Sequence, residues 1–364
     1  MKIVIIVWLF PPKRIAGTEI VTYLMAGHLA GRGHEVHVVT SLDEGLPEES
    51  CEKGFYVHRI PLIKIPVFYT LFFWYAIIRM IGKIEPDLVH AQDLGIGMPA
   101  LISKKMYNIP YLVWAQGFYD IYSPDGFTKL FLKPVIKNAD SAIALTEDMK
   151  GVMQNIYHRD IAVLPNGINL AEYIDEPGIK DKTTPGKVIL FVGRLDSVKG
   201  VQYLIRAMKR VHTKIPKARL IIVGDGPERE MLESLSLQLG IQKAVQFIGK
   251  VPHEKVKIFM QQADIFVLPS LCEGFPGVII EAMACGLPVV SSRVGGIPEI
   301  ITNDANGYLA DAKDAESIAD YLLLLLQDEK LRKKISYNNK QLVKKYSWEN
   351  VIVRLERLYQ LSIK

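Results

Sequence analysis

The sequence predicts an α/β protein made of two doubly wound domains, each built on a parallel sheet. Apolar, β-branched runs alternate with amphipathic stretches along nearly the whole chain, as in βα units whose sheet is covered on both faces. The 364 residues are enough for two domains of ordinary size. Residues 175–187 (DEPGIKDKTTPGK) are polar, rich in Pro and Gly, and typical of a linker. We therefore expect one domain over residues 1–172 and the other over residues 173–345.

The elements follow the same alternation in both halves. In the first half the expected strands are residues 2–7, 35–40, 56–60, 88–91, 111–115, 141–145 and 162–165, with a helix over 19–32. In the second half the expected strands are 188–192, 219–223, 245–248, 265–268 and 288–291, and the helices are 201–213, 228–239, 254–262 and 278–285. Open parallel sheets bind ligands beyond the carboxyl ends of their strands, so we expect the site in a cleft between the two domains.

Charge and cysteine content narrow the class of protein. The chain has 44 Lys and Arg against 39 Asp and Glu, a net charge of +5, and it lacks the long cationic runs of a dedicated nucleic-acid binder. A phosphorylated substrate or an anionic membrane surface suits this balance better. The three cysteines, Cys51, Cys272 and Cys285, form neither a CxxC pair nor a disulfide framework. They favour a reducing, cytoplasmic environment.

The apolar segments predict no membrane-spanning helix. Residues 3–7 read as a buried strand and not as a signal peptide, because a Pro-Pro turn follows and no cleavage site does. The longest apolar stretch, residues 65–81, is interrupted by Pro66 and Arg79 and is shorter than the roughly 20 residues a span needs. Two interpretations of residues 64–83 stay open. This basic, aromatic-rich segment either lies at a membrane interface on the cytosolic face or is a helix buried against the first sheet.

A phosphate site is predicted after the strand over residues 188–192. The strand ends at Gly193, and the loop up to the next helix carries Arg194 and Lys199. A helix N-terminus has unpaired N–H groups and a partial positive charge, so two cations beside it suit a phosphate. The alternative is that both are solvated loop charges.

Two carboxylates lie close to the next predicted helix N-terminus. Glu273 lies in the loop after the strand over 265–268, and Glu281 falls in the first turn of a helix that runs from about 278 to Gly286. Carboxylates accept hydrogen bonds from sugar hydroxyls, and the glycines of this loop let backbone amides approach a ligand. Acidic residues also occur in first turns only to balance the helix dipole, but the apolar surroundings of Glu281 argue against a merely solvated role.

The run from Glu273 to Gly286 resembles the EGFxxxxxEAMAxG segment of the retaining glycosyltransferases of family 4 (glycosyl transferases group 1). Six further segments agree in order: LPNGINLAEY (164–173), FVGRLDSVKG (191–200), VGDGPERE (223–230), ADIFVLPS (263–270), VGGIPEI (294–300) and YSWENV (346–351). The resemblance covers essentially the whole chain. It implies the GT-B fold, in which two Rossmann-like domains face each other across a cleft and the last helix, within residues 346–364, returns to the first domain.

The resemblance also implies roles for residues on the donor side. Arg194 and Lys199 would neutralise the donor pyrophosphate, Glu281 would hold the ribose hydroxyls, and Glu273 would hold the transferred sugar. Backbone around Val251 would line the nucleobase. The implied donor-binding set is Gly17, Gly193, Arg194, Lys199, Val251, Glu273, Gly274, Phe275, Pro276, Gly277, Val278 and Glu281. Its catalytic members are Glu273, Arg194 and Lys199, to which His90 is added from the acceptor side.

The acceptor side departs from the family pattern. The loop over residues 10–19 resembles the Gly-Gly loop of the family, but Ala16 replaces its first glycine, so only Gly17 is carried over. His90 matches the first histidine of a VHxH-type segment and is expected at the cleft, although a satisfied structural histidine is the alternative. Gln116 stands where the family has His, and glutamine cannot shuttle a proton. A front-face substitution, in which the departing phosphate takes the acceptor's proton, tolerates this change.

The resulting expectation is a retaining, metal-independent glycosyltransferase. Its partners would be a nucleoside-diphosphate sugar and a glycan or lipid-linked hydroxyl acceptor. No two aspartates are two residues apart, so no Asp-x-Asp metal motif exists, and we expect no metal and no cofactor. The alternatives are a nucleotide-sugar epimerase of the same fold and a non-catalytic nucleotide-sugar binding protein. A dehydrogenase is disfavoured because the pattern starting at Gly224 lacks the third glycine of the dinucleotide fingerprint.

Overall fold

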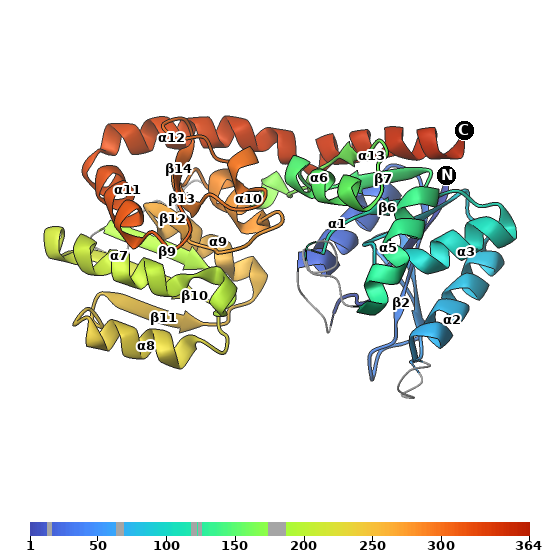
Figure 1. The fold of residues 1–364 in the computed structure, drawn as a ribbon, viewed down its shortest axis with the longest axis horizontal. Helices are drawn as coiled ribbons and strands as arrows, with labels where there is room; N and C mark the ends of the chain where they lie inside the picture. Colours follow the sequence, from blue (N-terminus) through green and yellow to red (C-terminus); the bar gives the residue numbers. More distant parts are fainter. Residues whose placement is uncertain (13–16, 63–68, 118–121, 123–125, 174–186) are drawn as a thin grey trace. The chain divides into compact units, whose positions relative to one another are not determined.

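The chain forms two compact units (Figure 1). The computed structural model describes residues 1–12, 17–62, 69–117, 122, 126–173 and 187–364. Unit 1 comprises Met1–Gly167 and Trp348–Lys364, and unit 2 comprises Ile168–Ser347. The changes of unit at 167/168 and 347/348 fall near the boundaries expected at 172/173 and 345/346. The expected linker lies outside the described residues except for Lys187, and the cleft between the domains stays a prediction.

Unit 1 is built on an eight-stranded sheet in the order β3-β4-β2-β1-β5-β6-β7-β8. The strands are β1 (Lys2–Ile6), β2 (Glu35–Ser41), β3 (Glu49–Glu52), β4 (Phe55–Ile60), β5 (Leu88–Ala91), β6 (Tyr111–Trp114), β7 (Ser141–Ala144) and β8 (Ala162–Val163). All neighbours are parallel except β3, which pairs antiparallel with β4. The sequence did not predict β3, because its polar residues ESCE at the sheet edge give no hydrophobic signal.

The helices of unit 1 form two layers. They are α1 (Gly17–Gly31), α2 (Tyr69–Ile84), α3 (Gly97–Tyr107), α5 (Gly126–Asn138), α6 (Glu147–Ile156) and α13 (Trp348–Ile363). The chain leaves β1 towards β2 in one direction and β5 towards β6 in the other, so right-handed crossovers put α1 and α3 on opposite faces. Helix α13 packs on α1, β5, β6 and β7, whereas α2 and α5 pack beside α3.

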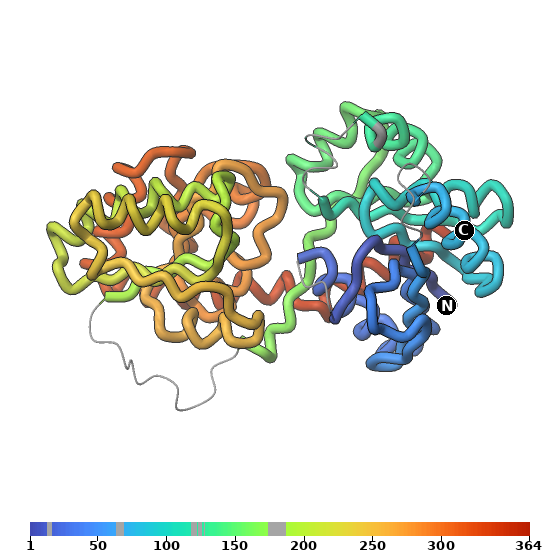
Figure 2. Tube along the Cα trace, turned by 90° about the horizontal axis from the view of Figure 1, so that it is seen from below, coloured from blue at the N-terminus to red at the C-terminus, as the bar shows by residue number. Residues whose placement is uncertain are grey.

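The last helix returns to unit 1, as the family resemblance implied. Both chain termini therefore belong to this unit (Figures 1 and 2). Trp348, at the start of α13, is fully buried and stacks on His28 of α1, with ring centroids 5.7 Å apart. This expectation is confirmed.

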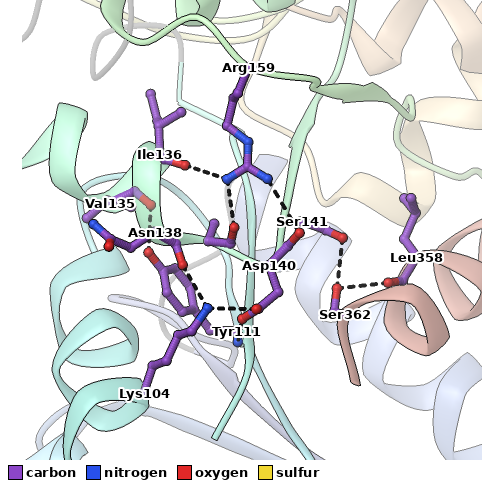
Figure 3. Close-up of polar contacts among 11 residues, drawn as sticks. Lys104, Tyr111, Val135, Ile136, Asn138, Asp140, Ser141, Arg159, Leu358 and Ser362 are labelled. Atoms are coloured by element: carbon purple, nitrogen blue, oxygen red, sulfur yellow. Dashed lines mark hydrogen bonds and ion pairs between the residues drawn. The ribbon is translucent and has the colours of Figure 1, made fainter. Parts of the chain in front are cut away.

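A polar junction ties α3 and α5 to the amino ends of β6 and β7 (Figure 3). Nζ of Lys104 on α3 pairs with Asp140 at 2.6 Å, and the other carboxylate oxygen of Asp140 accepts from the backbone N–H of Tyr111 at 2.9 Å. The guanidinium of Arg159 donates to two carbonyl groups at the C-terminal end of α5, at 2.7 and 2.6 Å. These bonds satisfy helix-end carbonyls that would otherwise lack a partner.

Helix α2 combines a buried and an exposed side. The helix packs against α3 and the strands β1, β2 and β4. Its buried residues are Phe73, Trp74, Ile77, Ile78 and Ile81, while Tyr69, Leu71, Phe72 and Tyr75 are exposed. The burial of one side agrees with a helix packed on the first sheet, and the exposed aromatic residues leave a membrane-interface role open. Residues 64–68 of this segment lie outside the described part. Among the described helices, none is long and apolar enough to cross a membrane.

Unit 2 is built on a six-stranded parallel sheet in the order β11-β10-β9-β12-β13-β14. The strands are β9 (Lys187–Val192), β10 (Ala218–Val223), β11 (Val245–Gly249), β12 (Ile265–Leu268), β13 (Val289–Ser292) and β14 (Gly307–Ala310). The helices are α7 (Val201–Lys214), α8 (Arg229–Gln238), α9 (His253–Gln262), α10 (Gly277–Ala284), α11 (Ala315–Gln327) and α12 (Glu329–Leu342). The two-domain α/β fold predicted from the sequence is confirmed.

The strand order fixes where a ligand site can form in unit 2. The chain runs outward from β9 through β10 to β11, and then returns to place β12 on the other side of β9. The loops that follow β9 and β12 therefore leave their strands in opposite directions. Such a topological switch point opens a crevice at the carboxyl ends of the strands, where ligands bind in doubly wound sheets.

Candidate functional site

The loops after β9 and β12 contact each other directly at the switch point. The backbone N–H of Leu271 donates to the carbonyl of Val198 at 2.7 Å. Gly200 has φ +62°, and a Cβ atom on it would lie only 2.3 Å from the carbonyl oxygen of Pro269. A glycine is therefore required for the two loops to approach this closely.

This approach brings Lys199 to Glu273, although 74 residues separate them in the sequence. Nζ of Lys199 lies 2.5 Å from Oε1 of Glu273, and the hydroxyl of Ser270 donates to the same oxygen at 2.7 Å. The Glu273 side chain is 10% exposed and that of Lys199 is 25% exposed. The carboxylate expected to hold the sugar and the ammonium expected to hold the pyrophosphate thus form one partly buried ion pair.

The loop after β13 supports Glu273 from behind. Gly295 has φ +50°, and a Cβ atom on it would lie 1.7 Å from the carbonyl oxygen of Glu273. Next to it, the N–H of Gly296 donates to the carbonyl of Gly274 at 3.2 Å. Gly295 and Gly296, which belong to the VGGIPEI segment (294–300), therefore hold the backbone of Glu273 and Gly274 in place.

Helix α10 begins one residue earlier than the sequence indicated. It starts at Gly277, and Pro276 at its N-cap offers no side-chain hydrogen bond to the first N–H groups. Glu281 is consequently the fifth helical residue and lies in the second turn, so the expectation of a first-turn position is wrong. A carboxylate in the second turn projects from the side of the helix. It does not serve to balance the helix dipole, because that effect falls off beyond the first turn.

Glu281 lies in a second cluster with two residues to which the sequence assigned no role. Its side chain is 17% exposed, the Tyr173 hydroxyl donates a hydrogen bond to it, and Nε2 of His253 lies 3.8 Å from its Oε1. Burial raises the pKa of the Glu281 carboxyl, and the nearby His253 opposes this rise. Burial and then the charge of Glu281 raise the pKa of Tyr173.

Signals for both additional residues exist in the sequence. Tyr173 is the last residue of the LPNGINLAEY segment that carries part of the resemblance. His253 is the first residue of α9 and follows the loop that includes Val251, which the resemblance assigned to the nucleobase. Only the fold shows that both side chains meet at Glu281.

The remaining donor-side residues are placed less uniformly. The Arg194 side chain is 72% exposed, and its Nε lies 3.6 Å from Asp196, so its ion pair is with Asp196 and not with Glu273. Val251, Phe275 and Val278 are partly buried and pack against the core of unit 2. Gly193, Gly274, Pro276 and Gly277 lie in the loops after β9 and β12 or at the start of α10.

His90 is not at an exposed site. It is fully buried on β5, and its Nδ1 lies 2.6 Å from the Tyr359 hydroxyl of α13. Burial lowers the pKa of His90 to about 3, so the imidazole is neutral at physiological pH. The expectation that His90 lies at a cleft as a catalytic residue is wrong, because the returning helix α13 covers it.

Gln116 lies at the carboxyl edge of the unit 1 sheet. It follows β6, its Oε1 accepts a hydrogen bond from Nδ2 of Asn166 at 2.8 Å, and its backbone N–H donates to Asp93 at 3.4 Å. Gly17 is the first residue of α1, and residues 13–16 before it lie outside the described part of the chain. Within the described residues, no group of three or more His, Cys, Asp or Glu side chains gathers as a metal site would require.

Comparison with known proteins places this architecture among the glycosyltransferases. Residues 15–172 match the family described as glycosyltransferase family 4, and residues 174–342 match glycosyl transferases group 1. An uncharacterized glycosyltransferase of Methanocaldococcus jannaschii is 31% identical over 100% of this chain and 99% of its own length.

Two solved structures show the same fold. Sucrose-phosphate synthase from Thermosynechococcus elongatus superimposes with a TM-score of 0.86 at 23% identity, covering 99% of this chain and 98% of that one. Anabaena HepE in complex with UDP-glucose does so with a TM-score of 0.80 at 20% identity, covering 99% of both chains. The fold and the match define a GT-B glycosyltransferase. The chain belongs to family 4 of the glycosyltransferases, the glycosyl transferases group 1.

Proposed function

We propose that this enzyme transfers a sugar from a nucleoside diphosphate to a hydroxyl acceptor, with retention of the anomeric configuration and without a metal ion. The observation that carries the proposal is the Lys199–Glu273 ion pair at the switch point of unit 2. It joins a hydrogen-bond acceptor suited to sugar hydroxyls and a cation suited to phosphate within 2.5 Å. A donor needs a hydrogen-bond acceptor for its sugar hydroxyls on one side of the bond that breaks and a cation for its phosphate on the other side.

The ion pair gives Lys199 a negative partner both before the donor binds and while the donor reacts. In the free protein, Lys199 compensates the charge of Glu273. When the bond between the anomeric carbon and the phosphate oxygen breaks, the leaving diphosphate gains negative charge, and a preorganised ammonium stabilises it. The acceptor oxygen bonds to the anomeric carbon on the same face, and its proton passes to the departing phosphate oxygen. Arg194, exposed on the same loop, adds a second cation.

The Glu281 cluster suits the ribose of the donor. In the free protein the carboxylate already accepts a hydrogen bond from the Tyr173 hydroxyl, which is the same type of bond that a ribose hydroxyl donates. His253 beside this carboxylate starts the helix that follows the loop of Val251, so base and ribose would bind side by side. The complex of Anabaena HepE with UDP-glucose, a protein of the same fold, supports a nucleoside-diphosphate sugar as donor.

The acceptor belongs to unit 1 in this proposal. Gln116 would orient the acceptor or the sugar through its amide and transfer no proton. The acceptor would be a hydroxyl of a glycan or of a lipid-linked glycan, presented in the cytoplasm. Gln116→His tests this role. A rate that rises manyfold and gains a pH dependence near neutrality would show that a base is required at this position.

The decisive experiment is a transfer assay with a panel of nucleoside-diphosphate sugars and acceptors, in the presence and absence of a chelator. We expect an α-linked donor to give an α-linked product, read by NMR, at a rate unchanged by chelator. Lys199→Met should abolish transfer, and Lys217→Met, which replaces an exposed lysine of the same unit, should not. Loss of activity in chelator with recovery in Mg²⁺ would refute metal independence. Donor turnover without acceptor would indicate an epimerase, and donor binding without any turnover would indicate a non-catalytic binder.

A further inference from the structure

Three neighbouring helices of unit 1 carry basic side chains and no acidic ones. Helix α2 has Arg79 and Lys83, α3 has Lys104 and Lys105, and α5 has three lysines at 129, 133 and 137. None of the three helices contains Asp or Glu, although the whole chain has 39 of these against 44 Lys and Arg. Lys104 forms an ion pair with Asp140, and the basic residues considered below are the other six of these helices.

The three helices form one layer, so their outer sides face the same way. The rings of Trp74 on α2 and Phe131 on α5 meet edge to face at 5.3 Å. Tyr107 of α3 packs so closely on Gly82 of α2 that a Cβ there would lie 2.7 Å from the tyrosine ring. We call the exposed sides of α2, α3 and α5 the basic face of unit 1.

Apolar side chains are exposed on the same face. Tyr75 of α2 is 59% exposed and Leu130 of α5 is 71% exposed, and Leu71, Phe72 and Met106 are exposed as well. Phe72, Tyr75, Arg79 and Lys83 follow each other at helical spacing, so aromatic and basic side chains share one stripe of α2. The lysines of α5 repeat this pattern next to Leu130.

We infer that the basic face docks on an anionic lipid bilayer. Cations attract acidic headgroups, and tyrosine, phenylalanine and leucine side chains between them reach the boundary of the acyl region. A nucleic acid would meet the charges but would leave the aliphatic side chains of Leu71, Met106 and Leu130 without an apolar environment. The inference rests on the proposed function in one respect. Helix α5 follows β6 and Gln116, so a docked bilayer lies beside the acceptor edge and favours a lipid-linked acceptor.

The test is vesicle co-sedimentation of the full-length protein at low ionic strength, without donor. Vesicles contain phosphatidylcholine alone or phosphatidylcholine mixed with phosphatidylglycerol. Each basic residue near an anionic surface strengthens binding about fivefold, so K129Q/K133Q/K137Q should bind the mixed vesicles on the order of 100-fold more weakly. The matched control K214Q/K217Q/K243Q neutralises three exposed lysines of unit 2 and should bind as the wild type does.

A second variant tests the apolar contribution. L71S/Y75S keeps every charge and should reduce binding most strongly at high salt, where the electrostatic attraction is screened. Circular dichroism melting confirms that the variants are folded; their side chains are exposed, so little change is expected. Absence of wild-type binding to mixed vesicles, an equal loss in the control triple variant, or tighter binding to duplex DNA than to vesicles would overturn the inference.

The outcome is independent of the proposed reaction. Nucleoside-diphosphate binding by the same variants in lipid-free solution reports on the unit 2 site alone and should be unchanged. A protein that binds mixed vesicles but transfers no sugar would refute the proposed function and leave the membrane contact standing. A protein that transfers sugar to soluble acceptors but does not bind vesicles would support the proposed function and refute the membrane contact.

Discussion

Replacing Lys199 with methionine removes the ammonium of the central ion pair and keeps a side chain of similar length. The effect on the free energy of unfolding can be bracketed from the structure. Exposed ion pairs contribute about 0–1 kcal/mol, whereas removing one partner of a buried pair costs about 3–5 kcal/mol. Here Lys199 is 25% and Glu273 10% exposed, and Ser270 continues to donate to the carboxylate. We therefore expect a destabilisation of about 2 kcal/mol, which lowers the melting temperature of a unit of this size by about 4–8 °C.

A double-mutant cycle with Glu273→Gln isolates the ion pair from other effects of each substitution. The two single variants and the double variant are unfolded by heat and by denaturant, with Lys217→Met as the control for removing a lysine from unit 2. We expect a coupling energy of about 1–2 kcal/mol, because the neutral amide introduced by Glu273→Gln no longer needs an ammonium. Effects that add to within about 0.5 kcal/mol would show that the two side chains do not interact in solution.

Ligand binding to the same variants separates the phosphate from the rest of the donor. Lys199→Met should weaken binding of a nucleoside diphosphate at least about tenfold, as expected when a cation is removed from a phosphate contact. It should leave binding of the unphosphorylated nucleoside unchanged, because Glu281 lies in a separate cluster. An equal loss for nucleoside and diphosphate, measured by calorimetry, would refute the assignment of Lys199 to the phosphate.

Three further outcomes follow from individual contacts. Gly295→Ala should lower the free energy of unfolding far more than Gly240→Ala and should abolish transfer. Both glycines have positive φ, but only a Cβ atom on residue 295 would meet another atom, the carbonyl oxygen of Glu273 at 1.7 Å. Equal losses of the two variants in thermal unfolding would contradict this. Burial raises the pKa of Glu281, so the wild type loses stability as pH rises from the ordinary value of 4.5 through the raised one. Glu281→Gln should lack this loss and be at least as stable at neutral pH, with weaker donor binding, and a less stable variant in denaturant titrations at neutral pH would refute it. Burial lowers the pKa of His90 from 6.5 to about 3, so its stability contribution is complete above pH 6.5 and is lost as pH falls towards 3. His90→Leu should flatten this part of the stability profile, and an unchanged slope would show that His90 does not cause it.

The sequence predicts local elements well and contacts between distant segments poorly. The strands and helices around the donor site were predicted within a residue or two, because buried strands and amphipathic helices leave their own periodicity in the sequence. The edge strand β3 left none, because its residues are polar and partly exposed and its side chains pair with the polar residues His58 and Arg59 of β4. Glu281 was predicted in the correct helix but in the wrong turn, because the first helical residue depends on the cap geometry of Pro276 and Gly277.

The tertiary structure decided which of these residues meet. Glu273 and Lys199 become partners only because β12 lies beside β9 in the sheet of unit 2. His90 changes from a candidate catalytic residue to a buried one because α13 returns from a position 269 residues later in the sequence and covers it. Tyr173 and His253 gain a role because the fold brings both to Glu281.

By itself, the sequence determined the fold class, the family resemblance and the loops that form the donor site, since these depend on local hydrophobic patterns and on motifs read along the chain. Only the tertiary structure decided the ion pair of Lys199 with Glu273, the neighbours of Glu281, the burial of His90 and the basic face of α2, α3 and α5. The physical reason is that each of these depends on side chains from distant segments lying within a few ångströms of each other. Strand order and helix packing set such contacts, and neither leaves a period in the sequence.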